Sequence, residues 1–365
     1  MEESGLKKQE GKTSFEDHIK ENSKGFGGFF NAHAHIDRAF TYEDKFYSHR
    51  DITLGYIEGC SLQEKQRLVW TLHVGSAFTP ESIEARIRKV LNDSIKYGVS
   101  RIDSCIDVTY NTKLVGWEIA RKLKKEYEGK IDFRIGVYNV AGFKKTEPER
   151  FKLFEEAAKT ADFIVALAEK DRKAGHIGER EHNIYMLNLG IALNKPVHFH
   201  VGQSNSPEEK GDRLLFSCMD VVYRGIHRLD KFPRNIIVHD ISITCCSEEE
   251  FNEHCEKLIE YNVGVICCPS AAISMRQNRK IIAPVHNSLA RVWDLCLKGI
   301  PVYLGTDNIN DVFVPSATPD LMDEVFVISN SLRFYNPWIL SKLACGKELD
   351  DFDRGKIMTA LCGKS

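Results

Sequence analysis

The sequence predicts an α/β protein folded as a (β/α)8 TIM-type barrel. Short apolar, β-branched segments alternate with longer amphipathic segments, and turn residues separate the two kinds. Eight such apolar segments follow one another, which favours a barrel, although the alternation alone would also fit a doubly wound sheet. Histidine and aspartate occur in or just after several of these segments, and barrels carry their active sites at the C-terminal ends of the strands.

The expected strands and helices follow from the periodicity of the apolar residues. The eight expected strands are residues 28–36, 101–108, 133–140, 163–168, 196–201, 235–239, 263–268 and 302–305. The helices expected between them include residues 81–97, 114–127, 183–193 and 248–261. In the first of these helices the apolar residues recur at steps of three and four, as one buried face requires; they are Ile83, Ile87, Val90, Leu91 and Ile95.

The chain divides into two parts, and the second contains a long insertion. Residues 1–24 carry many charges and few large apolar side chains, and we expect a mobile tail there. Residues 25–365 are expected to form a single barrel domain. A long insertion, residues 38–80, separates the first strand from its helix, and residues 62–74 within it have a helical pattern. A connection of this length is either a functional lid or an insertion that packs on the barrel rim.

Composition limits the classes of partner. Hydrophobic residues make up 42% and charged residues 28% of the chain, and the formal net charge is −2. This balance gives no electrostatic reason to expect nucleic acid or a membrane surface, so the expected partner is a small molecule or a second copy of the chain in a homo-oligomer. The 11 cysteines are scattered, without a C-x-x-C pair, as buried reduced thiols would be. Without a secretory h-region or an apolar run of the ~20 residues that span a bilayer, a cytoplasmic location is expected.

Histidines and an aspartate recur where four of the expected strands end. His33 and His35 stand two apart on the first strand, so both side chains point to one face. His200 lies on the fifth strand, His239 ends the sixth, and Asp307 follows the eighth. A single histidine in such a place is more often a hydrogen-bonded core residue, but the recurrence on four strands that meet at one barrel mouth favours a metal site.

The expected cofactor is one divalent metal ion. Neutral imidazoles with one carboxylate suit Zn²⁺ or Fe²⁺, with one position open for water. Such an ion lowers the pKa of its bound water to near 7, which supplies a hydroxide nucleophile at neutral pH.

Three segments carry a resemblance to a known family. Residues 30–37 (FNAHAHID) resemble the strand-one H-x-H-x-D motif of the amidohydrolase superfamily, in particular its cytosine deaminase branch. Residues 102–108 (IDSCIDV) and 304–308 (LGTDN) are similar to the second and eighth strands of that branch. The similarity extends at low identity from about Gly28 to the end of the chain. Many relatives add a small β-sandwich, which is not expected here; the barrel either stands alone or the chain is truncated.

The resemblance also implies residue roles. It implies that His33, His35, His200 and Asp307 hold the metal ion. It further implies that Asp307 accepts a proton from the attacking water, and that His239 hydrogen-bonds the water or the developing oxyanion.

Several pocket positions depart from the family pattern. Gln203 stands where deaminases carry a proton-shuttling glutamate, and an amide has no titratable carboxyl. Asn308 replaces a common second aspartate, Val140 a polar side chain of strand three, and Phe313 a usual tryptophan. We expect Gln203, Asn308 and Phe313 to contact the substrate. The departures argue against deamination of cytosine itself.

Some further polar residues have weaker claims to a role. Glu169, after the fourth strand and beside Lys170, would be the bridge if a second ion bound, although a solvated rim contact is the commoner use of such a pair. His198 is expected behind the ligands, and His49 and His73 of the insertion are candidates to line the pocket. The remaining histidines, at positions 18, 176, 182, 227, 254 and 286, are expected at the surface.

The predicted function is that of a metal-dependent hydrolase, an amidohydrolase. In it a metal-bound hydroxide attacks a C–N bond of a small cyclic or amide-like substrate. One alternative is a cytosine deaminase-like aminohydrolase with another acid, taken from the 38–80 insertion. The other is a catalytically silent relative that keeps the pocket as a binding module.

Overall fold

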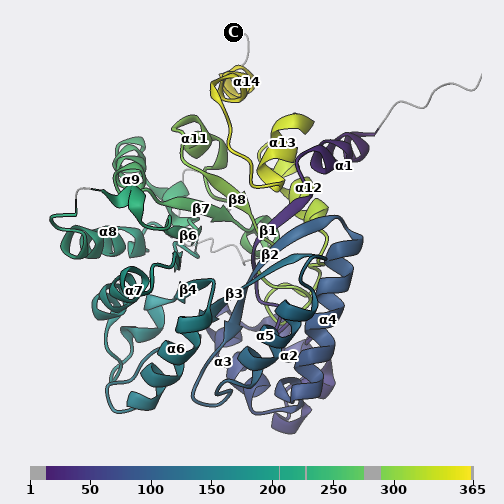
Figure 1. Cartoon of the computed structure of the whole chain (residues 1–365), viewed down its shortest axis with the longest axis vertical. Helices are drawn as coiled ribbons and strands as arrows, with labels where there is room; N and C mark the ends of the chain where they lie inside the picture. Colours follow the sequence, from purple (N-terminus) through teal and green to yellow (C-terminus); the bar gives the residue numbers. More distant parts are fainter. Residues whose placement is uncertain (1–13, 205, 227, 275–288, 363–365) are drawn as a thin grey trace, which may run out of the picture.

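Eight parallel strands form a barrel at the centre of the molecule (Figure 1). The computed structural model describes residues 14–204, 206–226, 228–274 and 289–362. The strands pair in chain order from β1 to β8; they are β1 Phe29–Ala34, β2 Val99–Asp107, β3 Asp132–Tyr138, β4 Phe163–Ala166, β5 Val197–Val201, β6 Ile236–His239, β7 Gly264–Cys267 and β8 Val302–Leu304. The predicted barrel and all eight predicted strands are therefore confirmed.

The barrel closes between β1 and the residues that follow β8. The His35 amide donates to the Asp307 carbonyl at 3.0 Å, and the Asp307 amide donates to the His33 carbonyl at 2.9 Å. Gly305 lies against His33 so closely that a Cβ at this position would stand 2.8 Å from the His33 Cβ. A glycine is required there, because any side chain would push the closing strand away from the two histidines of β1.

Helices surround the barrel and connect its successive strands, and the last three helices of the chain follow the last strand, β8 (Figure 1). They are α4 Pro80–Lys96, α5 Val115–Glu126, α6 Pro148–Thr160, α7 Glu179–Leu193, α8 Gly211–Val222, α9 Glu248–Glu260, α10 Pro269–Ile273, α11 Val292–Leu297, α12 Leu321–Ser331, α13 Pro337–Ala344 and α14 Asp351–Cys362. Helix α4 begins at a Thr79 cap and buries Ile83, Ile87 and Val90 against the barrel. Ile95, predicted on the same face, is 37% exposed because the helix ends there.

The N-terminal segment differs from the predicted tail. Residues Phe15–Gly25 form helix α1, whose first turn is closed by a capping box between Ser14 and Asp17. Ile19 is fully buried, and α1 lies beside α13, whose Ser341 hydroxyl donates to the Ile19 carbonyl at 3.4 Å (Figure 1). A mobile tail is therefore the wrong description of residues 15–24, because one apolar face finds a partner at the far end of the chain. Residues 1–13 of the predicted tail lie outside the described residues.

The 38–80 insertion is built of short helices. They are η1 Asp44–Phe46, η2 Ser48–Arg50, α2 Leu54–Gly59, α3 Leu62–His73 and η3 Ser76–Phe78, so the helix predicted at residues 62–74 is confirmed. Val69 of α3 is buried in one cluster with Cys105 of β2 and Tyr138 of β3. Helix α3 therefore covers part of the barrel mouth, on the side of β2 and β3.

The described residues agree with two further predictions. The ten cysteines whose side chains the structure describes are free thiols, and all but Cys246 are buried. Within the described ranges, none of the helices has both the length and the apolar character that crossing a bilayer would require.

Candidate metal and catalytic site

Strand β1 presents two imidazoles to the carboxylate that follows β8. The Nε2 atoms of His33 and His35 lie 3.5 Å and 3.2 Å from the Asp307 Oδ1. The other ring nitrogen of His33, Nδ1, contacts the Cys105 Sγ at 3.7 Å. Asp307 adopts a left-handed backbone with φ of +57°, a strained conformation for a non-glycine residue that turns up at functional sites.

Strand β5 supplies the third imidazole. The His200 Nδ1 lies 3.2 Å from the Ala166 carbonyl oxygen, so Nδ1 carries the proton and Nε2 keeps its lone pair. That Nε2 lies 3.1 Å from the His33 Nε2. The Tyr138 ring stacks on the His200 ring with centroids 5.3 Å apart and limits its rotation. One potential ligand atom from each of His33, His35 and His200 lies within 4.8 Å of the others.

The protonation state of this cluster suits a divalent cation. Burial, and then the positive charge of Arg38, lowers the pKa of His35 to about 3. Burial also lowers the pKa of His200 well below its usual value. The pKa of Asp307 is well below its usual range: burial opposes this, but hydrogen bonds to His33 and His35 outweigh it. The neutral imidazoles of His35 and His200 lie close to the charged Asp307 carboxylate, and a cation between them would stabilise that arrangement.

His239 joins the cluster from the end of β6. Its ring centroid lies 5.5 Å from that of His200 and 6.2 Å from that of His33. Burial lowers the pKa of His239 to about 4, so the ring is neutral at pH 7. A neutral imidazole offers one N–H donor and one acceptor toward whatever binds beside Asp307.

The backbone at His239 is strained and is held from outside the barrel. His239 and Asp240 have φ of +82° and +52°, in the left-handed region. The Asp240 Oδ2 lies 3.2 Å from the His254 Nε2, and the His254 Nδ1 lies 3.1 Å from the Asp212 Oδ2. His254 was expected at the surface, and that expectation is wrong because two buried carboxylates enclose its ring. His182 is likewise buried, with its Nδ1 2.7 Å from the Asp171 Oδ2.

The structure brings almost all of the predicted site residues to one cavity of ≈ 490 Å³, which we call the mouth pocket. Its lining includes His35, His200, Gln203, His239, Asp307, Asn308 and Phe313. His33, the remaining member of the predicted set, lies fully buried directly behind this lining, beside Asp307. Four strands distant in sequence thus deliver one group of side chains to the mouth.

The residues predicted to contact the substrate differ in whether their polar atoms already have hydrogen-bond partners within the protein. The Gln203 Nε2 is buried and has no hydrogen-bond partner among the described residues, so it is available to a bound molecule. The Asn308 Nδ2 donates instead to the Asp311 Oδ2 at 2.6 Å, which anchors its amide. Phe313 supplies an apolar wall.

Two pocket residues were missed by the sequence reasoning, Arg38 and Tyr138. Arg38 is buried, its Nε lies 3.7 Å from the Asp107 Oδ2, and its guanidinium lies 5.7 Å from the centre of the Phe313 ring. Burial opposes its charge, but Asp107 and other nearby carboxylates raise the pKa of Arg38 above its usual value. The sequence could have indicated Arg38, because this residue directly follows the H-x-H-x-D segment. Tyr138 ends β3 on the inward face that its alternation predicts.

Two other candidates lie away from the cluster. The Glu169 Oε1 accepts a hydrogen bond from the Gln66 Nε2 at 3.0 Å and lies 4.0 Å from the Lys170 Nζ. It is a contact to α3 at the rim and joins no cluster of metal-ligating atoms among the described residues. His198 stacks on Phe163 with ring centroids 4.3 Å apart, deeper in the barrel than His200.

The comparisons with known proteins agree with this architecture. No family model matches the chain. An uncharacterized protein of Haemophilus influenzae is 27% identical over 276 residues, which cover 76% of this chain and 93% of that protein.

Solved structures share the fold at lower identity. A 5-methylcytosine deaminase from Klebsiella pneumoniae superimposes with a TM-score of 0.70 at 19% identity, over 85% of this chain and 70% of that one. An N-isopropylammelide isopropylaminohydrolase from Burkholderia multivorans gives 0.64 at 16% identity, over 87% and 72%. The chain therefore has the barrel fold of these deaminases and aminohydrolases, and the resemblance found in its motifs is confirmed at the level of the fold.

Proposed function

We propose that this protein is a metal-dependent hydrolase that acts on a C–N bond of a small cyclic or amide-like substrate. The observation that carries the proposal is the convergence of the His33, His35 and His200 imidazoles and the charged Asp307 at the mouth pocket. His33, His35, His200 and Asp307 would hold one divalent ion, Zn²⁺ or Fe²⁺. The activities named for the deaminase and the aminohydrolase that share the fold support a C–N bond as the point of attack.

Different side chains of the pocket have different roles in the proposed hydrolysis. When bound, a divalent ion lowers the pKa of a coordinated water toward 7. Asp307 accepts the proton that the attacking water loses, and its low pKa makes it available as a charged base. His239 hydrogen-bonds the substrate oxygen on which negative charge develops. Gln203 and Arg38, which both line the pocket, orient the substrate.

Metal content and amine release test this proposal together. Purified protein is expected to carry well above ~0.3 equivalents of Zn²⁺ or Fe²⁺, or to be activated by adding Zn²⁺, Fe²⁺ or Mn²⁺. A panel of pyrimidines, triazines and cyclic amides then identifies the bond that is cleaved. His200→Ala should lose both metal and activity, whereas His49→Ala, at an exposed histidine of the insertion, should keep both. Protein that neither holds metal nor gains activity from it contradicts the proposal.

One observation favours a second candidate, a deaminase whose acid comes from the insertion. Glu58 and Glu64 of the insertion line the same mouth pocket as Asp307. The Glu64 Oε2 accepts from the Ser61 amide at 2.7 Å, and the Glu58 Oε1 accepts from the Tyr42 hydroxyl at 3.0 Å. If one of them shuttles the proton, Glu58→Gln or Glu64→Gln will abolish ammonia release and leave the metal content unchanged. Full ammonia release by both variants would remove this candidate.

A further inference from the structure

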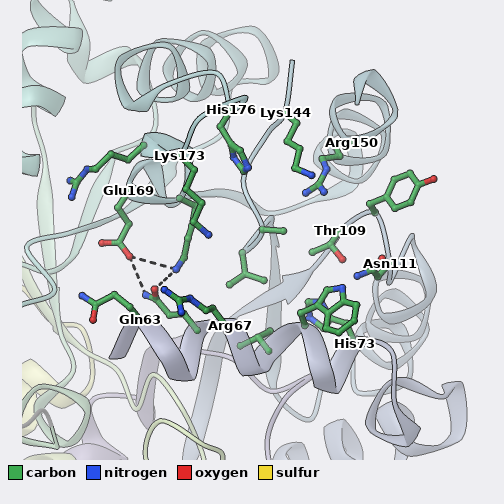
Figure 2. A pocket seen from close by; sticks show the side chains of 18 residues that line it. Gln63, Arg67, His73, Thr109, Asn111, Lys144, Arg150, Glu169, Lys173 and His176 are labelled. Atoms are coloured by element: carbon green, nitrogen blue, oxygen red, sulfur yellow. Dashed lines mark hydrogen bonds and ion pairs between the residues drawn. The ribbon is translucent and has the colours of Figure 1, made fainter. Parts of the chain in front are cut away.

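A second cavity, of ≈ 740 Å³, is shown in Figure 2 and shares part of its lining with the mouth pocket. It lies between helix α3 and the segments that follow β2, β3 and β4. We call it the cationic pocket, because six positively charged side chains line it: Arg67, Lys144, Arg150, Lys170, Arg172 and Lys173. The lining contains one carboxylate, that of Glu169.

Half of these cations are held by carboxylates outside the lining. Glu147 accepts from the Lys144 Nζ at 2.8 Å and also pairs with Arg150. Glu179 accepts both guanidinium contacts of Arg172, at 2.8 Å. These pairs hold the segments after β3 and β4 in place, and they leave the other three cations to face the cavity.

Arg67 and Lys173 face the cavity without a carboxylate partner. Neither side chain has a hydrogen bond or an ion pair within the part of the chain that the structure describes. Arg67 rises from α3, while Lys173 extends from the segment after β4 on the opposite wall (Figure 2). Two free charges of the same sign on facing walls favour an anion between them.

Lys170 lies near both of these cations and is largely removed from water. Its side chain is 12% exposed; it contacts the Gln66 Oε1 and lies 4.0 Å from the Glu169 Oε1. Burial first, and then the like charges of Lys173 and Arg67, lowers the pKa of Lys170 to about 8, although Glu169 opposes this. A buried ammonium with more cations than carboxylates around it is costly, and an anionic ligand would stabilise its charge.

Neutral donors and aromatic surfaces complete the walls. Thr109 and Asn111, from the segment after β2, lie across the cavity from Glu169 (Figure 2). The exposed rings of Trp70 and Tyr110 also line it. A cavity of ≈ 740 Å³ exceeds the size of a lone inorganic anion, so it has room for a ligand with an organic part as well.

The two pockets are adjacent. Gln63 and Gln66 of α3, together with Val140, line both of them. A molecule that extends past these three residues would contact both the residues proposed to hold the metal and the cations. Cations that approach from separate walls match a dianion with several acceptor oxygens better than a planar carboxylate.

We propose that the cationic pocket binds a phosphate group carried by a small organic molecule. That molecule is either the substrate itself, an assignment that rests on the function proposed above, or a separate ligand that binds beside it. Arg67, Lys170 and Lys173 contact the phosphate oxygens.

Calorimetric titration of the full chain with inorganic phosphate and pyrophosphate tests the site without any need for activity. We expect saturable binding that weakens at least about tenfold in the double variant Arg67→Gln/Lys173→Gln, because two charged contacts are lost. The matched control Lys89→Gln/Lys96→Gln removes the same charge from α4, away from the pocket, and should bind as the wild type does. All four altered side chains, those of Arg67, Lys89, Lys96 and Lys173, are exposed. If the double variant Arg67→Gln/Lys173→Gln fails to fold, Lys173→Gln alone serves as the test.

Two results overturn the inference. One is a wild-type protein that shows no saturable binding of either anion. The other is equal weakening in the two double variants, which would show an effect of net charge alone. Neither result depends on metal or hydrolysis: protein that binds phosphate but lacks hydrolase activity refutes only the proposed function, and an active metalloenzyme that binds no phosphate refutes only this inference.

Kinetics with a matched pair of substrates, one phosphorylated and one not, distinguish the two sources of the phosphate. If the substrate carries it, Arg67→Gln/Lys173→Gln raises KM about tenfold for the phosphorylated form and leaves KM of the other form unchanged. If a separate ligand carries it, added inorganic phosphate changes KM of the unphosphorylated form in the wild type and not in the variant. Both results support the site.

Discussion

The mouth pocket and the cationic pocket lie side by side, yet they are lined by different kinds of side chain from different kinds of element. In the mouth pocket, short side chains on strand ends are buried, neutral or paired, and fixed by backbone contacts such as that of His200 to the Ala166 carbonyl. In the cationic pocket, long charged side chains extend from α3 and from connecting segments, and two of them, Arg67 and Lys173, have no partner among the residues that the structure describes. Rigid strands suit groups that must meet a reacting atom, whereas longer side chains on helices and loops suit recognition of a charged group.

The largest expected effect comes from removing the charge of the mouth pocket. Asp307→Asn keeps the shape of the side chain but loses a metal ligand and a base, so kcat should fall about 10³-fold or more and bound metal should decrease. Kinetics and metal analysis measure both. Asp103→Asn changes a buried aspartate in the middle of β2, paired with Arg101 and outside the lining of the mouth pocket, and should leave the metal in place. Equal metal content in all three proteins would contradict the ligand role of Asp307.

A change in the barrel closure should affect the same pocket indirectly. In Gly305→Ala the new methyl group would meet the His33 backbone at 2.9 Å, so β1 and its two histidines must shift. We expect metal affinity to fall about 10–100-fold, with a loss of ~1–3 kcal/mol of stability. Gly55→Ala, in α2, is the control, because its nearest atom lies 4.0 Å away. Unchanged metal affinity in Gly305→Ala would show that the closure does not position His33.

A smaller effect is expected from supplying the missing acid. Gln203→Glu places a carboxyl where the Gln203 Nε2 now lies buried without a partner, and ammonia release from an aminopyrimidine should rise about tenfold or more. Gln63→Glu places the same charge on α3 and should not have this effect. If neither variant gains activity, position 203 is not what limits deamination.

The smallest effect is a pH dependence of stability at the strained end of β6. Burial opposes the charge of His254, but Asp240 and Asp212 raise its pKa to about 10. Its stabilising contribution is therefore complete below the unfolded-state pKa of about 6.5 and is lost as pH rises toward 10. Urea unfolding from pH 6 to 10 should show a decline of ~1–2 kcal/mol in the wild type that His254→Gln lacks. If the free energy of unfolding changed with pH in the same way in the wild type and in His254→Gln, the pairing of His254 with Asp212 and Asp240 would be contradicted.

The sequence predicted the parts of the molecule that follow from local periodicity. Eight strands, helix α3 and the convergence of His33, His35, His200 and Asp307 all follow from residue spacing and from the rule that strand ends share one mouth. Helix α1 was missed, although its Ser14–Asp17 capping box is visible in the sequence, because its stability depends on a distant partner, α13.

The remaining features depend on contacts between distant segments. The burial of His254 requires Asp212 and Asp240, which lie on other elements. The cationic pocket joins Arg67 to Lys170 and Lys173, about a hundred residues further along the chain. A net charge of −2 conceals this local excess of positive charge.

Helix α3 forms one wall of both pockets, and it belongs to an insertion between β1 and its helix rather than to the barrel repeat. Substitutions on this helix can alter the lining of both pockets without changing the strands that position the proposed metal ligands. In evolutionary terms the insertion is a separable specificity module: relatives that keep the barrel and exchange the insertion would inherit the reaction and acquire a new range of substrates.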